Sequence, residues 1–287
     1  MSDLLQMGVL SAIAVATGLV GPFLILKRMA MFANSLSHTI LLGIAIAFLV
    51  TGGPLFSLPN LLIGALLAAL MTAFLTEGLV RFFRLQEDAS IGLIFTALFA
   101  AGITLVTLFM RDVHLGIEAV MGNVELLQFA DLKLSLSLVG LNLVAILLFY
   151  KQFQLSSFDR SLAKTLGVPC GVFHFLLLFL VATTCIGAFR AVGVLLVLAF
   201  LVGPFLTARL FCHRLPWLLF WTPLVGIFAS VAGVLLSRLC FDLFGLPLST
   251  GGIVATLIGL IYVVARCMTK INLFTPVPES ANLEGNS

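Results

Sequence analysis

Charged side chains are scarce in this sequence, and their scarcity decides which solvent the chain can fold in. Asp, Glu, Lys and Arg make up 9% of its 287 residues, whereas hydrophobic residues make up 61%. A soluble domain carries about 25% charged residues, so this chain could not cover a surface that faces water. We therefore expect membrane lipid to be its solvent.

Several motifs that carry chemistry are also absent. The five cysteines occur singly, without a CxxC pair, which favours small apolar residues in helices over a metal or redox site. No lysine follows a glycine, so the chain has no Walker A motif and cannot bind ATP through a P-loop. An active site of a membrane hydrolase would need a motif such as HExxH, G-x-S-x-G or a zinc-type spacing of His and Cys. The sequence contains none of these motifs. We expect a transport protein, not an enzyme, with no stably bound cofactor.

The formal net charge of +3 is small, and the basic residues lie between apolar stretches instead of forming one cluster. This pattern lacks the electrostatic footprint of a nucleic-acid-binding protein. We expect no nucleic-acid partner.

Nine apolar stretches are long enough to cross a bilayer core of ~30 Å, which takes about 20 residues per helix. They run approximately over 4–26, 35–51, 59–80, 90–110, 132–150, 171–188, 191–210, 217–240 and 251–267. The second is short, and only the Phe189–Arg190 step divides the sixth from the seventh, so eight spans are the alternative. The first stretch is too long for a signal peptide and is interpreted as a retained span.

These stretches predict an all-α fold, a polytopic bundle of transmembrane helices over residues 1–270. The polar tail 271–287 is expected to be disordered. Basic residues gather in cytoplasmic loops, so they predict an orientation with the N-terminus outside and the C-terminus inside. In that orientation eleven of the fifteen lie in inner connections: Lys27, Arg28, Arg81, Arg84, Lys151, Arg160, Lys164, Arg209, Arg214, Arg266 and Lys270.

The inner connection 151–170 contains the signals of a short amphipathic helix. Ser157 or Asp159 can cap its start, Leu162 and Leu166 share one face, and Gly167 ends it. Such a helix is either a docking element for a soluble partner or an ordinary surface helix. Spacing alone leaves both interpretations open.

One apolar segment occurs twice. The sequence LVGPFL at 19–24 recurs at 201–206, and both stretches are expected to run from outside to inside. A Gly-Pro step removes a backbone hydrogen bond and allows a helix to kink. Gly21-Pro22 and Gly203-Pro204 are therefore either two equivalent kinks beside a pathway or a chance repeat in an apolar sequence of low diversity.

Polar side chains within the apolar stretches are informative because each is costly unless it is paired or functional. Asn34, Ser37 and His38 lie within one helical turn near the mouth of the second span. An imidazole nitrogen and an amide oxygen pointing the same way could bind or pass a divalent metal ion. The alternative is a histidine hydrogen-bonded to a neighbouring helix. Glu77 is expected to extend to the membrane surface or to pair with Arg81 one turn later.

The sequence resembles the ABC-3 family, the permeases of bacterial ABC importers for manganese, zinc and iron. The segment after Gly21-Pro22 and the segment around Asn34 and His38 carry this resemblance first. It continues through most of the chain, at 43–45, 89–98, 121–124, 158–167, 190–196, 203–210 and 250–253.

The resemblance implies a location in the bacterial cytoplasmic membrane and a pathway formed by two permease subunits. It also implies two cytoplasmic ATPase subunits and an external metal-binding protein that delivers manganese, zinc or iron. Residues 157–168 then form the helix that couples to the ATPase, through Asp159, Leu162, Leu166 and Gly167. The family usually has Asp where this chain has Asn34, with His at the place of His38, along the metal path.

The loss of that carboxylate predicts weaker ion binding at this subunit. One hypothesis is a heterodimer whose second permease keeps the Asp. The rival functions are an ion-coupled secondary transporter, a membrane-embedded enzyme that uses His38, and an ABC permease for a siderophore or vitamin. Only Glu77 approaches the mid-span carboxylate that a secondary transporter usually needs.

Overall fold

The computed structural model describes residues 2–51, 58–109, 124–158, 160–245 and 249–270. Within these residues the fold is all α-helical, and nine helices are long and apolar enough to cross a membrane. The long helices are α1 (Ser2–Leu26), α2 (Ala30–Thr51), α3 (Leu58–Phe83), α4 (Glu87–Phe109), α6 (Phe129–Phe158), α8 (Cys170–Val192), α9 (Val194–Phe211), α10 (Leu215–Phe244) and α11 (Thr250–Lys270). Two short elements accompany them, the 3₁₀ helix η1 (Val124–Leu126) and α7 (Arg160–Thr165). The all-α polytopic bundle predicted from the sequence is confirmed.

The structure changes two of the predicted boundaries. The sixth and seventh spans are separate helices, but α8 continues through Phe189 and Arg190 and ends at Val192. Gly193 separates the two helices. Its φ of +83° is favourable for glycine and strained for other residues. The second span is not short: α2 begins at Ala30 and has 22 residues. Residues 34–38 therefore lie inside its first turns.

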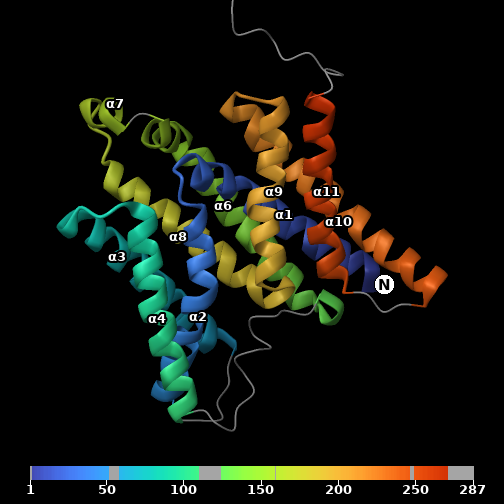
Figure 1. The fold of residues 1–287 in the computed structure, drawn as a ribbon, viewed down its shortest axis with the longest axis horizontal. Coiled ribbons are helices and arrows are strands. Elements are labelled where there is room, and N and C mark those ends of the chain that lie inside the picture. The colour runs from blue at the N-terminus through green and yellow to red at the C-terminus, as the bar shows by residue number, and fades with distance from the viewer. Residues whose placement is uncertain (1, 52–57, 110–123, 159, 246–248, 271–287) are drawn as a thin grey trace, which may run out of the picture.

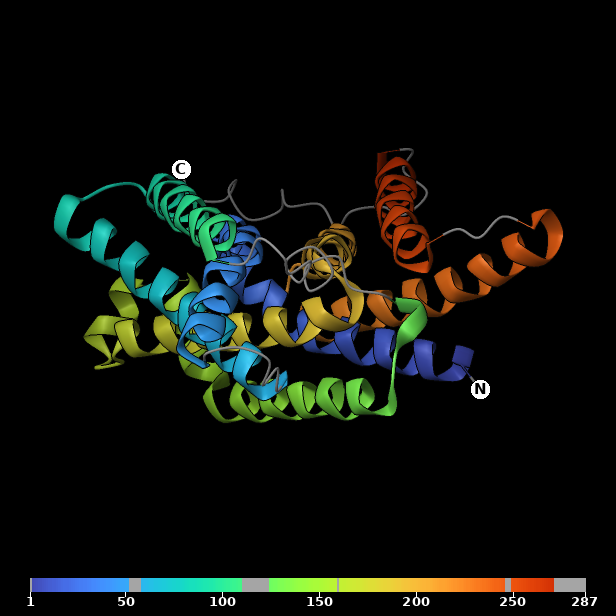
Figure 2. The same cartoon turned by 90° about the horizontal axis from the view of Figure 1, so that it is seen from below.

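Two helices form the centre of the bundle. α1 and α8 are the most buried spans, and α1 contacts α6, α8, α9 and α10. The helices α2, α3 and α4 pack together on one side, and α9, α10 and α11 on the other (Figures 1 and 2). α6 covers one side of the central pair, α1 and α8. On the opposite side of the bundle, α2 and α9 lie between α4 and α11 (Figure 2).

Glycines allow helix backbones to approach closely where these groups pack, as is common in membrane bundles. A Cβ on Gly43 of α2 would lie 2.4 Å from the carbonyl oxygen of Gly64 in α3. A Cβ on Gly21 of α1 would lie 2.6 Å from the carbonyl oxygen of Leu201 in α9. The repeated LVGPFL segments therefore meet at the crossing of α1 and α9. Pro22 and Pro204 lie inside these continuous helices, and a kinking role for the two Gly-Pro steps stays a prediction.

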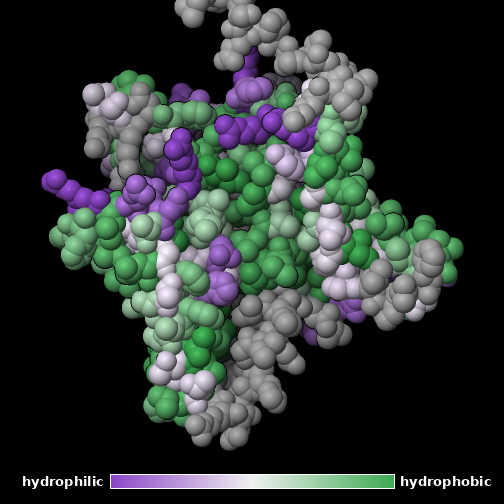
Figure 3. Space-filling view, in the orientation of Figure 1, coloured by the Kyte–Doolittle hydropathy of each residue, from purple (hydrophilic) through white to green (hydrophobic). Residues whose placement is uncertain are grey.

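Polar residues gather at one end of the bundle. The connections after α1 and α9, the helix α7 and the end of α11 lie in the upper part of Figure 1, and the connection after α3 lies lower, on the left. Figure 3 shows hydrophilic side chains concentrated at this end and hydrophobic ones over the sides. Large apolar side chains point outward along the sides, among them Val50, Phe74, Leu195 and Leu260. This surface suits lipid and not water. The predicted tail 271–287 lies outside the described residues.

Candidate functional site

Asn34 and His38 form a polar face on α2. Both side chains are partly exposed, and they lie one helical turn apart. The His38 ring packs against two rings of α4, with centroid distances of 5.1 Å to Phe95 and 5.1 Å to Phe99. Among the described residues its neighbours are aromatic, and no hydrogen-bond partner from another helix meets its ring nitrogens. The packing fixes the ring and leaves its nitrogens for a ligand.

Ser37 is placed differently from its neighbours. It is 1% exposed, and its Oγ donates a hydrogen bond of 2.6 Å to the carbonyl oxygen of Asn34. This bond satisfies the hydroxyl within α2, as is common for serine in membrane helices. The structure thus brings Asn34 and His38 together on the partly exposed face and turns Ser37 toward the bundle. Its assignment to a metal path stays a prediction.

The polar face on α2 offers an incomplete ligand set for a metal. Asn34 supplies an amide oxygen and His38 an imidazole nitrogen, whereas manganese, iron and zinc usually take four or more ligands. No group of three or more His, Cys, Asp or Glu side chains converges anywhere in the described ranges. One chain alone can therefore hold an ion only weakly, with water or a second subunit completing the coordination. Weak sites are what conduction requires, since a tight site would trap the ion.

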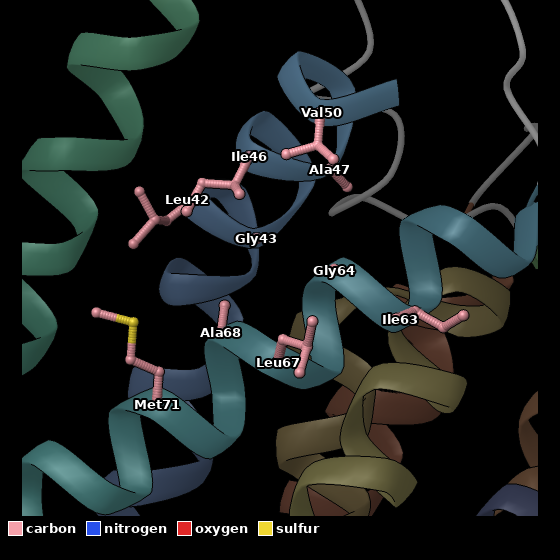
Figure 4. A pocket seen from close by; sticks show the side chains of 10 residues that line it. All are labelled: Leu42, Gly43, Ile46, Ala47, Val50, Ile63, Gly64, Leu67, Ala68 and Met71. Carbon is pink, nitrogen blue, oxygen red and sulfur yellow. The ribbon is translucent and has the colours of Figure 1, made fainter. Parts of the chain in front are cut away.

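A cavity of about 340 Å³ lies between the later part of α2 and the first part of α3 (Figure 4). Figure 4 shows Leu42, Ile46 and Val50 of α2 lining it beside Leu67 and Met71 of α3. Its lining residues are apolar or glycine, so it contains no oxygen or nitrogen side-chain ligand for an ion. This groove is distinct in chemistry from the face that carries Asn34 and His38.

The inner connection forms a short exposed helix. α6 continues beyond the predicted end at 150, through a kink at Phe149 (φ −113°, ψ 24°), to Phe158. α7 follows over Arg160–Thr165, within the predicted helix 157–168, whereas Ser157 and Phe158 belong to α6. Asp159 lies outside the described residues.

The end of α7 has the geometry that its sequence predicted. Gly167 has a φ of +73°, and the N–H of Val168 donates to the carbonyl oxygen of Ala163 at 2.9 Å. These features define a Schellman motif, which confirms that Gly167 ends the helix. Leu162 is 47% exposed and Leu166 62% exposed, whereas Ala163 between them is buried. α7 therefore rests on the bundle through Ala163 and presents the two leucines outward.

A buried polar cluster joins α3 to α8. The Oε1 atom of Glu77 lies 2.7 Å from Nε of Arg81, which confirms the predicted pair within α3. The other carboxylate oxygen lies 3.3 Å from Nε2 of His174 in α8. From the sequence, His174 is merely a histidine near a membrane boundary, and nothing in its local spacing indicates Glu77 as a partner. The local sequence therefore does not predict this contact.

Two further polar contacts tie α6 to α8. Asn142 is fully buried, and its Nδ2 donates to the hydroxyl of Thr184 at 2.7 Å and to the carbonyl oxygen of Ala16 at 3.1 Å. At the opposite end from α7, Asp131 lies 3.5 Å from Arg190. Such contacts set the rotation of apolar helices whose hydrophobic surfaces alone would allow many packings.

The chain is similar to known membrane transport proteins over nearly its whole length. The model of a family described as "ABC 3 transport family" matches residues 1–269. The manganese transport system membrane protein MntD of Bacillus subtilis is 35% identical over 275 residues, covering 91% of this chain and 90% of its own length. A second protein of that bacterium, the manganese transport system membrane protein MntC, is 32% identical over 226 residues, which span 77% of this chain and 52% of MntC.

A solved structure has the same fold. The structure of PsaBC from Streptococcus pneumoniae in complex with Fab matches with a TM-score of 0.74 and 25% sequence identity. The match covers 93% of this chain and 94% of the matched chain. The helix arrangement described above is therefore shared over nearly the whole chain.

Proposed function

This chain belongs to the ABC 3 transport family and is the membrane permease of an ABC metal importer, and we propose that it passes divalent manganese, iron or zinc by alternating access. The observation that carries the proposal is the family match over residues 1–269. The matched range takes in both the polar face of α2 and the exposed α7. The cargo ion is a substrate, and the permease itself makes and breaks no covalent bond.

The proposal assigns ATP hydrolysis to separate cytoplasmic ATPase subunits. Leu162 and Leu166 are exposed at the end of the bundle where polar residues gather, although exposed leucines gain nothing there in water. Seated in an apolar groove of an ATPase, they would be buried. We therefore take this end as cytoplasmic, with the N-terminus outside and the chain in the bacterial cytoplasmic membrane. Asp159 is proposed to belong to the same contact.

The metal path is proposed to run along the face that carries Asn34 and His38, with Ser37 beside it. A second permease would cover this face, between α4 and α11 (Figure 2), and complete the coordination. An external metal-binding protein would deliver the ion at the opposite end. Because Asn34 is neutral, this chain supplies the weaker half of the ligand set, and a partner with a carboxylate would supply the stronger half.

A non-identical partner fits one of the comparisons. Bacillus subtilis has two different proteins named as membrane proteins of a manganese transport system, and both are similar to this chain. We propose that this permease likewise works in a heterodimer. Full metal uptake by this permease with only the ATPase and the delivery protein would refute the heterodimer.

The proposed cycle couples ATP binding and hydrolysis to the opening of the metal path on one side of the membrane and then on the other. Closure of the ATPase subunits on ATP moves α7, the bundle opens outward, and the delivery protein releases its ion onto the polar face of α2. Hydrolysis returns the bundle to an inward-open state. The ion crosses without binding tightly at any step, which keeps the passage fast.

The decisive experiment is uptake by the purified complex in proteoliposomes. We expect uptake that depends on ATP and the ATPase, with manganese, iron and zinc competing with one another and a chelated iron or a vitamin failing to compete. Uptake driven by an ion gradient without any ATPase would instead identify a secondary transporter. Competition by the chelated iron would identify a siderophore permease.

A further inference from the structure

Glu77 is the centre of a buried cluster that spans two helices. Its carboxylate accepts a hydrogen bond from Arg81 at 2.7 Å, and its other oxygen lies 3.3 Å from Nε2 of His174. The Glu77 side chain is 11% exposed and that of His174 is 4% exposed, whereas Arg81 reaches outward at 59%. An unpaired carboxylate at this depth would be costly. The three groups are therefore held together as α3 and α8 move.

His174 lies one turn after the start of α8, the helix that follows the element that we assign to the ATPase contact. α8 begins at Cys170, directly after the connection that ends α7. At Gly171 an added Cβ would lie 3.3 Å from Nη2 of Arg81, so the first turn of α8 also lies against α3. α8 consequently meets α3 at two successive levels, and a displacement of its start cannot leave α3 unaffected.

The other end of α7 is held as firmly. Phe153 of α6 packs against Phe23 of α1 at 5.5 Å and against Phe173 of α8 at 5.9 Å. Phe149, at the kink of α6, lies 5.5 Å from Phe173. These rings join the end of α6 to the start of α8, next to His174. A force on α7 thus moves both of its flanking helices as one body, since close-packed interiors transmit strain.

α3 continues the contact toward the metal path. Gly64 of α3 and Gly43 of α2 approach so closely that a Cβ on either would lie within 2.6 Å of the other's carbonyl oxygen. α2 carries Asn34 and His38. Packed contacts therefore connect α7 to α8, α8 to α3 through the polar cluster, and α3 to the helix that bears the ligands.

A metal-binding role for the cluster is disfavoured by its charges. A carboxylate beside an imidazole suits manganese or zinc. Here, however, Arg81 occupies the other carboxylate oxygen with a permanent positive charge. A divalent cation would have to overcome that repulsion as well as displace a hydrogen bond. The cluster fits a mechanical role better than a step on the ion path.

We propose that Glu77 and His174 are positioning residues that transmit the movement of α7 to α3, and so couple ATP hydrolysis to opening of the metal path. The inference rests on the proposed function, because it requires an ATPase at α7. The polar contact between His174 and Glu77 is the link that carries the displacement between the helices. Removing it should separate hydrolysis from transport.

The test measures ATP hydrolysis and manganese uptake in the same proteoliposomes containing the complete complex. We expect His174→Ala to lower the uptake per ATP hydrolysed by about tenfold, within the range of coupling effects of single residues. ATP hydrolysis itself should persist. His174→Gln, which keeps a donor for Glu77, should restore most of the coupling. His213→Ala is the matched control, because His213 is an exposed histidine in the connection between α9 and α10 and should leave the ratio unchanged.

The remaining outcomes all decide the matter. Equal loss of hydrolysis and uptake in His174→Ala, or unchanged coupling, overturns the inference. If His174→Ala does not assemble, Glu77→Ala takes its place, with Glu77→Gln as the conservative variant that still accepts from His174. Failure of both alanine variants to assemble assigns the pair a purely structural role and also overturns it. A wild-type complex without ATP-driven uptake defeats the proposed function instead, so the two failures are distinguishable.

Discussion

In the proposed metal path, Asn34 and His38 give α2 two neutral ligands on a partly exposed face, and we expect the lack of charge there to set how strongly an ion is held. The imidazole is positioned by Phe95 and Phe99, so the ligand geometry does not depend on the ion being present. Electrostatic attraction is the missing component. The residue at position 34 is accordingly the most direct means of changing ion affinity without changing the fold.

We predict that Asn34→Asp strengthens manganese binding to the purified complex by about fivefold, since a carboxylate adds a favourable charge interaction of about 1 kcal/mol near a solvated site. Isothermal titration of the complex with manganese measures the change. Asn34→Leu, which removes the oxygen ligand, is the matched control and should weaken binding. Equal affinities of the Asp and Leu variants would show that Asn34 does not face the ion.

Asn142 is a second residue whose effect can be stated in advance. It is fully buried and donates to both α1 and α8. We expect Asn142→Leu to lower the free energy of unfolding by about 1 kcal/mol, because hydrogen bonds between membrane helices contribute about 0.6 kcal/mol each on average. Thermal unfolding in detergent checks this, with Ser137→Ala, an exposed site on α6, as the control. No shift for Asn142→Leu, or an equal shift for both variants, would contradict the assignment.

The Glu77–Arg81 pair could be predicted because residues four apart share one face of a helix. His174 could not be assigned as a partner, since that contact depends on how α8 is rotated against α3. Helices that are hydrophobic on all sides do not reveal in their sequence which face they bury. The same limit applies to Ser37, which the predicted helix places beside His38 and the packing turns inward.

Individual helices differ in how far their sequences define them. The nine spans could be placed from hydropathy to within a few residues at most ends, because a bilayer dictates their length. The sequence places the division between α8 and α9 at the Phe189–Arg190 step, because a charge interrupts the apolar run there, whereas the backbone conformation of Gly193 makes the break. The extension of α6 to Phe158 was missed because residues 151–158 are polar enough to resemble a loop.

The crossing of α2 and α3 depends on Gly43 and Gly64, and its tolerance for a methyl group can be measured. We predict that Gly43→Ala destabilises the protein by about 1–3 kcal/mol, as overpacking a tight interface does, because its Cβ would lie 2.4 Å from a carbonyl oxygen. Gly78→Ala is the control within α3, since no atom lies within 4 Å of the Cβ it would add. It should be neutral or stabilising by up to about 1 kcal/mol. Thermal unfolding compares the two, and equal effects would contradict the close contact.

The exposed face of α7 yields a prediction about assembly. Leu162→Ala together with Leu166→Ala should reduce copurification of the ATPase by at least about tenfold, because each buried leucine contributes about 1.5–3 kcal/mol. Pull-down with a tagged permease measures the loss. Thr165→Ala, on the same short helix, removes an exposed hydroxyl and should leave binding intact. Undiminished copurification of the double variant would place the ATPase contact elsewhere.

The molecule as a whole is a bundle with two chemically different ends. α7 and the connections after α1 and α9 lie at one end, and the start of α11 lies at the other. Nine spans among the described residues would put residues 2 and 270 on opposite sides of the membrane. The account of transport depends on which end meets the cytoplasm, because an ATPase can reach α7 only from there.

Labelling from the two sides of the membrane therefore tests the central claim most directly. In a variant without the native cysteines, Leu166→Cys marks the end that carries α7, and Ser249→Cys marks the opposite end. We predict that a membrane-impermeant maleimide modifies position 249 in intact spheroplasts, whose cytoplasmic membrane is accessible from outside. It should modify position 166 only in inside-out vesicles. Modification of position 166 from the outside would contradict the account, since no cytoplasmic ATPase could then bind α7.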